Sequence, residues 1–69
     1  MINERVELLP DYKESLIQGK LRFKFYDLHT TVIDVDCYAD GECKILWMHS
    51  SFDNPQIDRC LLSELYIVE

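Results

Sequence analysis

The stretch "VIDVDCYADGECKILWM", residues 32–48, decides the fold because it joins two runs of alternating apolar and polar residues through "YADGE". A period of two is what a strand with one buried face requires. Asp40 and Gly41 suit a three-residue hairpin loop, in which a type I turn is followed by a glycine in the left-handed region. The stretch therefore predicts a tight antiparallel hairpin in the middle of the chain.

The length of this loop decides which side chains enter the core. A three-residue loop predicts the core pairs Cys37–Cys43, Val35–Ile45 and Ile33–Trp47 and the outer pairs Asp36–Lys44 and Asp34–Leu46. A two-residue loop would instead bury Leu46 and Met48 and turn Trp47 outward, because a shift of one residue turns every side chain of a strand over. We favour the three-residue loop, since Asp-Gly is not the best pair for the shorter turn.

The segments around the hairpin carry further strand patterns. "GKLRFKFYD" (19–27) alternates apolar and polar residues, "RVELL" (5–9) is a weaker first strand, and "RCLLSELYIVE" (59–69) reads as a strand, a turn at Ser63 and Glu64, and a last strand. The alternative for the last segment is a helix, because Asp53 and Gln56 have capping-box spacing before an apolar stripe of helical period. We favour the strands.

Segment 10–19 predicts one or two helical turns, with Asp11 and Glu14 spaced as a capping box and Gly19 as a C-cap. With five short strands and irregular segments at 10–19 and 50–57, the chain resembles the order of a small SH3-like barrel, a likeness of architecture and not of family. We predict a mainly β, five-stranded antiparallel SH3-like barrel forming one small domain over 1–69. The alternative is a compact α+β domain with a C-terminal helix at about 54–65.

Charge is distributed unevenly along the 69 residues. Thirteen acidic residues against seven basic ones give a net charge of −6, and residues 27–58 hold seven acids with Lys44 as their one Lys or Arg. Such a field repels phosphate backbones and attracts basic proteins, so we expect no direct nucleic-acid binding. The exception is Lys20, Arg22 and Lys24 on the outward side of one predicted strand. We interpret them as charges that protect a sheet edge, in preference to RNA contacts.

Neither the N-terminus nor the cysteines indicate export. "MINERVELLP" has no long apolar run, so we predict no signal peptide, no membrane span and a cytoplasmic location. Cys37, Cys43 and Cys60 are odd in number, which does not make a disulfide framework. We expect all three to be reduced, buried and hydrophobic in character.

Motifs for catalysis or metal binding fail on spacing. A calcium loop counted from Asp34 lacks the required glycine and glutamate, and no cysteine pair has the C-x-x-C spacing that grips zinc. "HSSFD" (49–53) places His, Ser and Asp in sequence, whereas triads are assembled by the fold. We therefore predict no enzyme activity, no cofactor and no metal.

The remaining hypothesis is a small acidic, non-enzymatic protein-binding module that acts through the central hairpin and the loop after it. Its predicted contacts are four carboxylates and two aromatic anchors: Asp34, Asp36, Asp40, Glu42, Tyr38 and Phe52. In size and acidity the chain resembles the small acidic inhibitors made by phages and mobile elements, which implies a partner with a basic, nucleic-acid-binding surface. The alternative is a homo-oligomeric structural or accessory subunit, such as a homodimer, that pairs through an edge strand.

Overall fold

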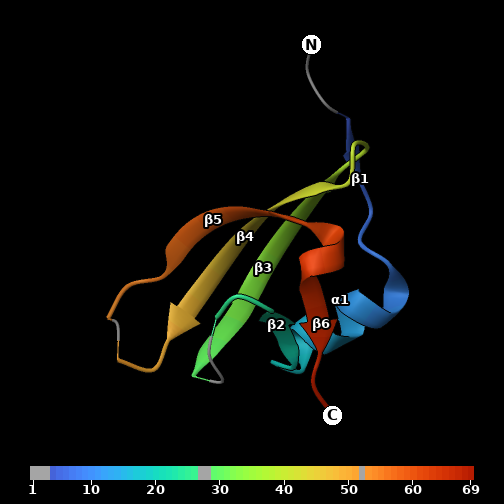
Figure 1. Ribbon diagram of the computed structural model, residues 1–69. Coiled ribbons are helices and arrows are strands. Elements are labelled where there is room, and N and C mark those ends of the chain that lie inside the picture. Colours follow the sequence, from blue (N-terminus) through green and yellow to red (C-terminus); the bar gives the residue numbers. More distant parts are fainter. Residues whose placement is uncertain (1–3, 27–28, 52) are drawn as a thin grey trace.

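A computed structural model describes residues 4–26, 29–51 and 53–69 (Figure 1). Along the chain the elements are β1 (Arg5–Val6), α1 (Pro10–Ile17), β2 (Leu21–Phe23), β3 (Thr30–Tyr38), β4 (Glu42–His49), β5 (Gln56–Leu61), the 3₁₀ turn η1 (Leu62–Glu64) and β6 (Leu65–Ile67). The prediction of a mainly β chain is confirmed.

The strands of the described part form two antiparallel sheets. One sheet has four strands in the order β1-β3-β4-β5, and the other pairs β2 with β6. The small sheet and α1 lie over one face of the large sheet, which we call the inner face (Figure 1). Because the strands divide between two sheets that do not close into a barrel, the more specific expectation of a five-stranded SH3-like barrel is not supported.

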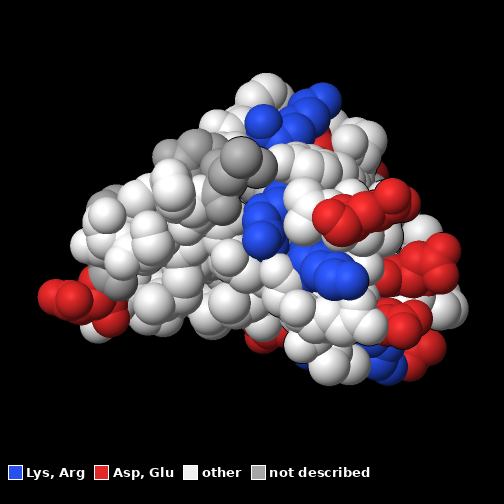
Figure 2. Space-filling view, turned by 90° about the horizontal axis from the view of Figure 1, so that it is seen from below, with Lys and Arg blue, Asp and Glu red and all other residues white. Residues whose placement is uncertain are grey.

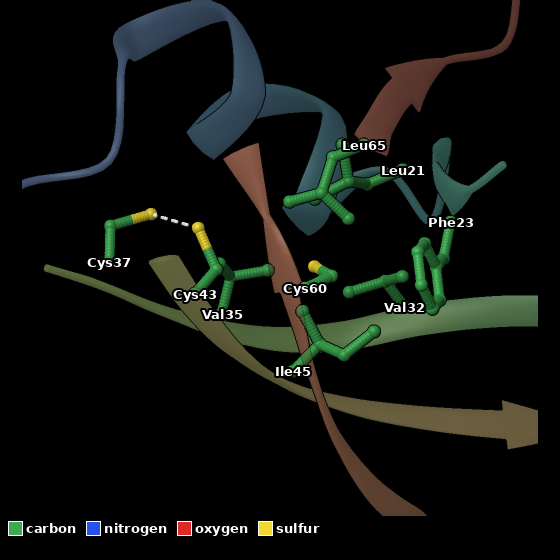
Figure 3. Close-up of a cluster of buried hydrophobic side chains, with 9 residues drawn as sticks. All are labelled: Leu21, Phe23, Val32, Val35, Cys37, Cys43, Ile45, Cys60 and Leu65. Carbon is green, nitrogen blue, oxygen red and sulfur yellow. Dashed lines mark hydrogen bonds between the residues drawn. The ribbon is translucent and has the colours of Figure 1, made fainter. Parts of the chain in front are cut away.

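The inner face of the large sheet carries the core (Figure 3). Leu21, Phe23 and Leu65 from the small sheet pack onto Val32, Val35, Cys37, Cys43, Ile45 and Cys60 from the large one. All three cysteines are free and buried, as the sequence predicts. Tyr12 and Leu16 of α1 pack against this cluster, so α1 covers part of the core.

The C-terminal segment is built from strands, and the alternative of a helix at 54–65 is wrong. Residues Gln56–Leu61 pair with β4 along the whole of β5, which a helix could not do, and the side chain of Cys60, opposite Cys43, is buried. The chain turns at η1, where the predicted turn lies, and the Glu64 carboxylate accepts a hydrogen bond from Leu61 N at 2.7 Å. Edge pairing with β4 therefore outweighs the helical stripe.

Helix α1 confirms the predicted turns at 10–19 but differs at its start. Pro10 occupies the first turn, and Gly19, at φ +72°, follows the helix in the left-handed conformation. Leu9 is the N-cap and no side chain caps it, so the expected capping box of Asp11 and Glu14 does not form. Ser15 Oγ instead donates to the carbonyl oxygen of Asp11 at 2.8 Å.

The central hairpin has the predicted three-residue loop. Gly41 has φ +88°, and its N–H donates to Tyr38 O at 3.0 Å. The pairs closest to the loop are those expected: Cys37–Cys43, Asp36–Lys44, Val35–Ile45 and Asp34–Leu46. The two-residue turn is thereby excluded.

Further from the loop, the predicted register is wrong. A β-bulge lies between Val32 and Asp34, so that Val32, and not Ile33, pairs with Trp47. Val32 is fully buried, whereas Ile33 is 43% exposed. The extra residue turns the start of β3 over, which places Val32 against the core and Ile33 on the opposite, outer face.

Strand β2 is shorter than the predicted strand at 19–27. It ends at Phe23, and the chain then turns, leaving Phe25 66% exposed. The ring of Phe25 meets that of Phe23 edge to face, with centroids 5.3 Å apart. Three residues of β2 pair with β6, and beyond them Lys24 N donates one more hydrogen bond, to Glu64 O at 2.9 Å, before the chain turns away.

Candidate functional site

The outer face of the large sheet is the side opposite the core. Its residues come from alternate positions of β3, β4 and β5, and each described one is exposed or half-buried. The core, α1 and the small sheet all lie on the other side. The outer face of the described strands is therefore open to solvent and not covered by α1 or the small sheet.

Four apolar side chains gather on this face, and we call them the apolar patch: Ile33, Leu46, Met48 and Ile57. Leu46 stands opposite Ile57 on β5 and opposite Asp34 on β3, next to the bulge residue Ile33. Met48 lies two residues further along β4, on the same side as Leu46. Ile57 is 65% exposed, so the patch is open to solvent at its β5 end.

A shallow depression adjoins the patch. Its volume is about 180 Å³. Asp34, Asp36, Lys44, Leu46 and Ile57 line it, so carboxylates, an ammonium group and apolar side chains border the same hollow. This composition suits a contact with a protein side chain better than an apolar ligand, for which pockets are deeper and mostly hydrophobic.

The predicted site residues lie at the loop end of this face. Asp34, Asp36 and Tyr38 alternate along the outer side of β3, and Glu42 begins β4 on the same side, since its neighbour Cys43 points inward. Asp40 occupies the loop, where its Oδ1 accepts a hydrogen bond from Glu42 N at 3.0 Å. The structure therefore brings these five together. Phe52 lies outside the described residues.

Each of the two carboxylates on β3 has a hydrogen-bond partner within the chain. Asp36 forms an ion pair and hydrogen bond with Arg5 of β1, and this contact with Asp36 raises the pKa of the arginine. Asp34 Oδ1 accepts a hydrogen bond from Val35 N at 2.9 Å, which orients the carboxylate along its own strand. Both carboxylates are thus fixed in place on the outer face.

Basic residues interrupt the acidic surface that the sequence predicts. Asp36 faces Lys44, which in turn faces Arg59 on β5, so this row across the sheet contains both signs of charge. The outer face is therefore amphipathic and mixed in charge. The acidic excess of the chain acts as a longer-range field around it.

Sequence reasoning missed Ile33, Ile57 and Arg59 as members of this face. The alternation of "TTVIDVDCY" contains one ambiguous point, the adjacent apolar pair Val32 and Ile33. Either residue could enter the core, and the period of two along the rest of the strand selects Ile33. The core cluster, which includes Leu21 and Phe23 of β2, contains Val32 and not Ile33. These contacts come from outside the strand, and its alternation does not reveal them.

The basic segment around β2 does not present all its charges to a ligand. The Arg22 guanidinium folds back, and its Nη1 donates to the carbonyl oxygens of Gly19 at 2.7 Å and Leu21 at 3.1 Å. Lys20 and Lys24 remain exposed. Figure 2, which views the molecule from below, shows basic and acidic side chains interspersed on this side. The described residues on this side do not form the single-sign stripe that is typical of RNA-binding proteins.

A polar cluster closes one end of the core. The Asp58 carboxylate, on the inner side of β5, accepts hydrogen bonds from Tyr26 OH and, at 3.4 Å, from Trp47 Nε1. Burial, followed by the hydrogen bond with Asp58, raises the pKa of Tyr26 to about 12. The rings of Tyr26 and Trp47 are in contact, with centroids 4.5 Å apart. The cluster ties the turn after β2 to the large sheet.

In the described ranges, no group of three or more His, Cys, Asp or Glu side chains is arranged to hold a metal ion. No helix of these ranges has both the length and the apolar character that a membrane crossing requires. Comparisons with protein-family models, with curated proteins and with solved structures gave no match. We therefore infer function from the surface chemistry of the described residues.

Proposed function

We propose that this chain is a small non-enzymatic protein-binding module that uses the outer face of its large sheet. The observation that supports this is the bulge that turns Ile33 outward. Burying an isoleucine side chain completely is worth roughly 1.5–3 kcal/mol, and a residue that is 43% exposed forgoes part of this. Bulges are over-represented where a strand re-aims a side chain for function, and here the re-aimed side chain completes the apolar patch.

The partner that fits this face has an apolar centre and a basic rim. Ile33 and Ile57 would lie under the centre of the contact, while Asp34, Asp40 and Glu42 border it on the loop side. The net charge of −6 would steer a basic partner toward the chain and raise the rate of association at low salt. An inhibitor that binds the basic surface of a nucleic-acid-binding protein, as the sequence suggests, would be one kind of such a protein-binding module.

The charge pattern sets a limit on that inhibitor hypothesis. A mimic of a phosphate backbone needs an unbroken line of negative groups, whereas Lys44 and Arg59 interrupt the line and Asp36 is paired with Arg5. We therefore favour recognition through the apolar patch with acidic steering. Competition by DNA or RNA for the partner would favour the mimic instead.

The alternative function, a homo-oligomer formed through an edge strand, meets an obstacle at β5. This six-residue strand ends the large sheet, so it is the natural place for a second copy to pair. Opposed residues of an antiparallel pair lie on the same face, so a symmetric pairing centres on one residue. The two registers that pair most of β5 are centred on Asp58 or on Arg59. Each register places that residue opposite its own copy, and like charges directly opposite each other are destabilising.

The experiment is an affinity capture with matched variants, followed by a binding measurement on the purified partner. We compare the natural chain with Ile57→Ser on the outer face and with Ile17→Ser, whose side chain on α1 is 80% exposed in the other layer. A true partner is captured by the natural chain and by Ile17→Ser and is lost with Ile57→Ser.

The second step measures the affinity of that partner for each variant. We expect Ile57→Ser to weaken binding by about tenfold or more, which corresponds to one buried apolar contact. Equal affinity for all three chains, loss with Ile17→Ser alone, or failure to capture any protein would contradict the proposal. A monomeric mass by light scattering at micromolar concentration would set aside the homo-oligomer.

A further inference from the structure

Two thiols meet at the end of the core next to the hairpin loop. Cys37 of β3 and Cys43 of β4 are directly opposed, and their Sγ atoms are 3.2 Å apart. In Figure 3 both side chains point toward each other at one end of the cluster, apart from Cys60. Both thiols are buried, so the protein holds them in mutual contact.

A small apolar pocket leads to this pair. Its volume is about 160 Å³, and Cys37 and Cys43 belong to its lining. Val6, Leu9 and Gly41 also line it and are themselves exposed, so the pocket opens to solvent, and the buried residues Cys37 and Cys43 are part of its wall. One water molecule takes about 30 Å³ in the liquid, so the pocket admits only small molecules.

The pair has the geometry that a disulfide needs. Directly opposed residues of antiparallel strands have Cα atoms about 4.5–5.5 Å apart, inside the range of about 4.4–6.8 Å for disulfides. The sulfur atoms would move from 3.2 Å to about 2.05 Å, which small side-chain rotations achieve. No rearrangement of the hairpin is required.

We propose that Cys37 and Cys43 are a modification site that a small neutral hydroperoxide, entering through the apolar pocket, oxidises to a disulfide. In the first step the sulfur of one cysteine attacks a peroxide oxygen, the O–O bond breaks, and the products are a sulfenic acid and water or an alcohol. In the second step the other thiol attacks the sulfenic sulfur, the S–S bond forms, and water leaves with the thiol proton. Two thiols lose two electrons and two protons in total, and the hydroperoxide accepts them.

Burial changes the acidity of two of the three thiols. Burial, followed by the hydrogen bond with Cys37, raises the pKa of Cys43 to about 12. Cys43 therefore keeps its proton at neutral pH. Burial also raises the pKa of Cys60 to about 11. Its side chain lies apart from the Cys37–Cys43 pair (Figure 3), so it is not placed to complete the disulfide.

Tryptic peptide mapping tests the proposal directly. The reduced folded chain is treated with hydrogen peroxide, unreacted thiols are alkylated, and the chain is digested. Peptide 25–44 contains both Cys37 and Cys43, while peptide 60–69 contains Cys60. We expect peptide 25–44 to be lighter than the dithiol by two hydrogen atoms and free of alkylation, with Cys60 alkylated. Met48 lies in peptide 45–59, so its oxidation is read separately.

Variants test two points: that Cys37 and Cys43, and not Cys60, form the disulfide, and that the oxidant enters through the pocket. Cys60→Ala should still form the disulfide, and Cys37→Ala should form none. Val6→Phe narrows the mouth and should slow oxidation several-fold in the folded chain without changing the rate in urea. Oxidised glutathione, which is large and charged, should react at least about tenfold more slowly than peroxide with the folded chain.

Three results would overturn the inference. The first is a peptide 25–44 that carries two alkylated thiols under conditions that oxidise the same chain in urea. The second is a cross-link between peptides 25–44 and 60–69. The third is an unchanged rate in Val6→Phe, with the fold of each variant verified by circular dichroism. None of these outcomes depends on the proposed protein-binding function.

Discussion

The bulge at Ile33 predicts losses of stability of different size for two neighbouring substitutions, Val32→Ala and Ile33→Ala. Val32 is fully buried against the core, and truncating it removes two methyl groups from a closed site. At about 0.8 kcal/mol per buried carbon, with a further contribution from the cavity, we expect a loss of about 2 kcal/mol in the free energy of unfolding. For a chain of this size that lowers Tm by roughly 8–16 °C.

Ile33→Ala removes more carbon atoms but from the outer face. Because Ile33 is 43% exposed and the core contains none of its side chain, we expect a loss below about 1 kcal/mol. Both residues are β-branched, so the change in intrinsic strand preference is similar and largely cancels in the comparison. The pair is therefore an internal control for the register.

Urea unfolding followed by Trp47 fluorescence measures both values, since Trp47 is the one tryptophan and packs against the core. The quantity of interest is the difference between the two variants at equal m-values. A regular strand without a bulge would bury Ile33 opposite Trp47 and expose Val32. A larger loss for Ile33→Ala than for Val32→Ala would refute the bulge.

Three other properties can be checked in the same way. Asp58→Ala should lower the free energy of unfolding by about 1–3 kcal/mol relative to the isosteric Asp58→Asn, because Tyr26 OH loses its acceptor. In a chain that also carries Tyr26→Phe, Asp58→Ala should lose this effect; an equal loss in both backgrounds would show that the hydroxyl is not responsible. The raised pKa values of Tyr26, Cys43 and Cys60 mean that the folded chain holds protons which the unfolded chain releases at high pH. The urea midpoint should therefore fall as the pH rises from about 9 to 12. A midpoint that does not fall between pH 9 and 11 would contradict this. Gly41→Ala, at φ +88°, should cost about 1 kcal/mol in a thermal melt, whereas a stabilised variant would rule out the left-handed turn.

Local sequence signals predicted the parts of the fold that local chemistry determines. The loop at Gly41, the pairs nearest to it, the turns before Gly19 and the turn at η1 all depend on residues adjacent in sequence. Only glycine adopts a positive φ without steric strain, so these positions leave few alternatives. These predictions are confirmed because the contacts that decide them join residues close together in the sequence.

Contacts between distant segments determine what the sequence could not. Whether Val32 or Ile33 enters the core depends on β2, and the end of β2 at Phe23 depends on its pairing with β6. The apolar patch requires the register of β5 against β4, which brings Ile57 opposite Leu46. The acidic part of the candidate site was predictable from alternation alone, whereas its apolar part was not.

Ile33 belongs to the proposed binding surface only if β3 contains the bulge, and inter-strand nuclear Overhauser effects across the hairpin test this most directly. The structure predicts cross-strand backbone contacts between Val32 and Trp47 and between Asp34 and Leu46, with no regular partner for Ile33. It also predicts contacts from the Val32 methyl groups to the core side chains. Cross-strand contacts between Ile33 and Trp47, with Ile33 methyl groups against the core, would contradict the account and remove Ile33 from the outer face.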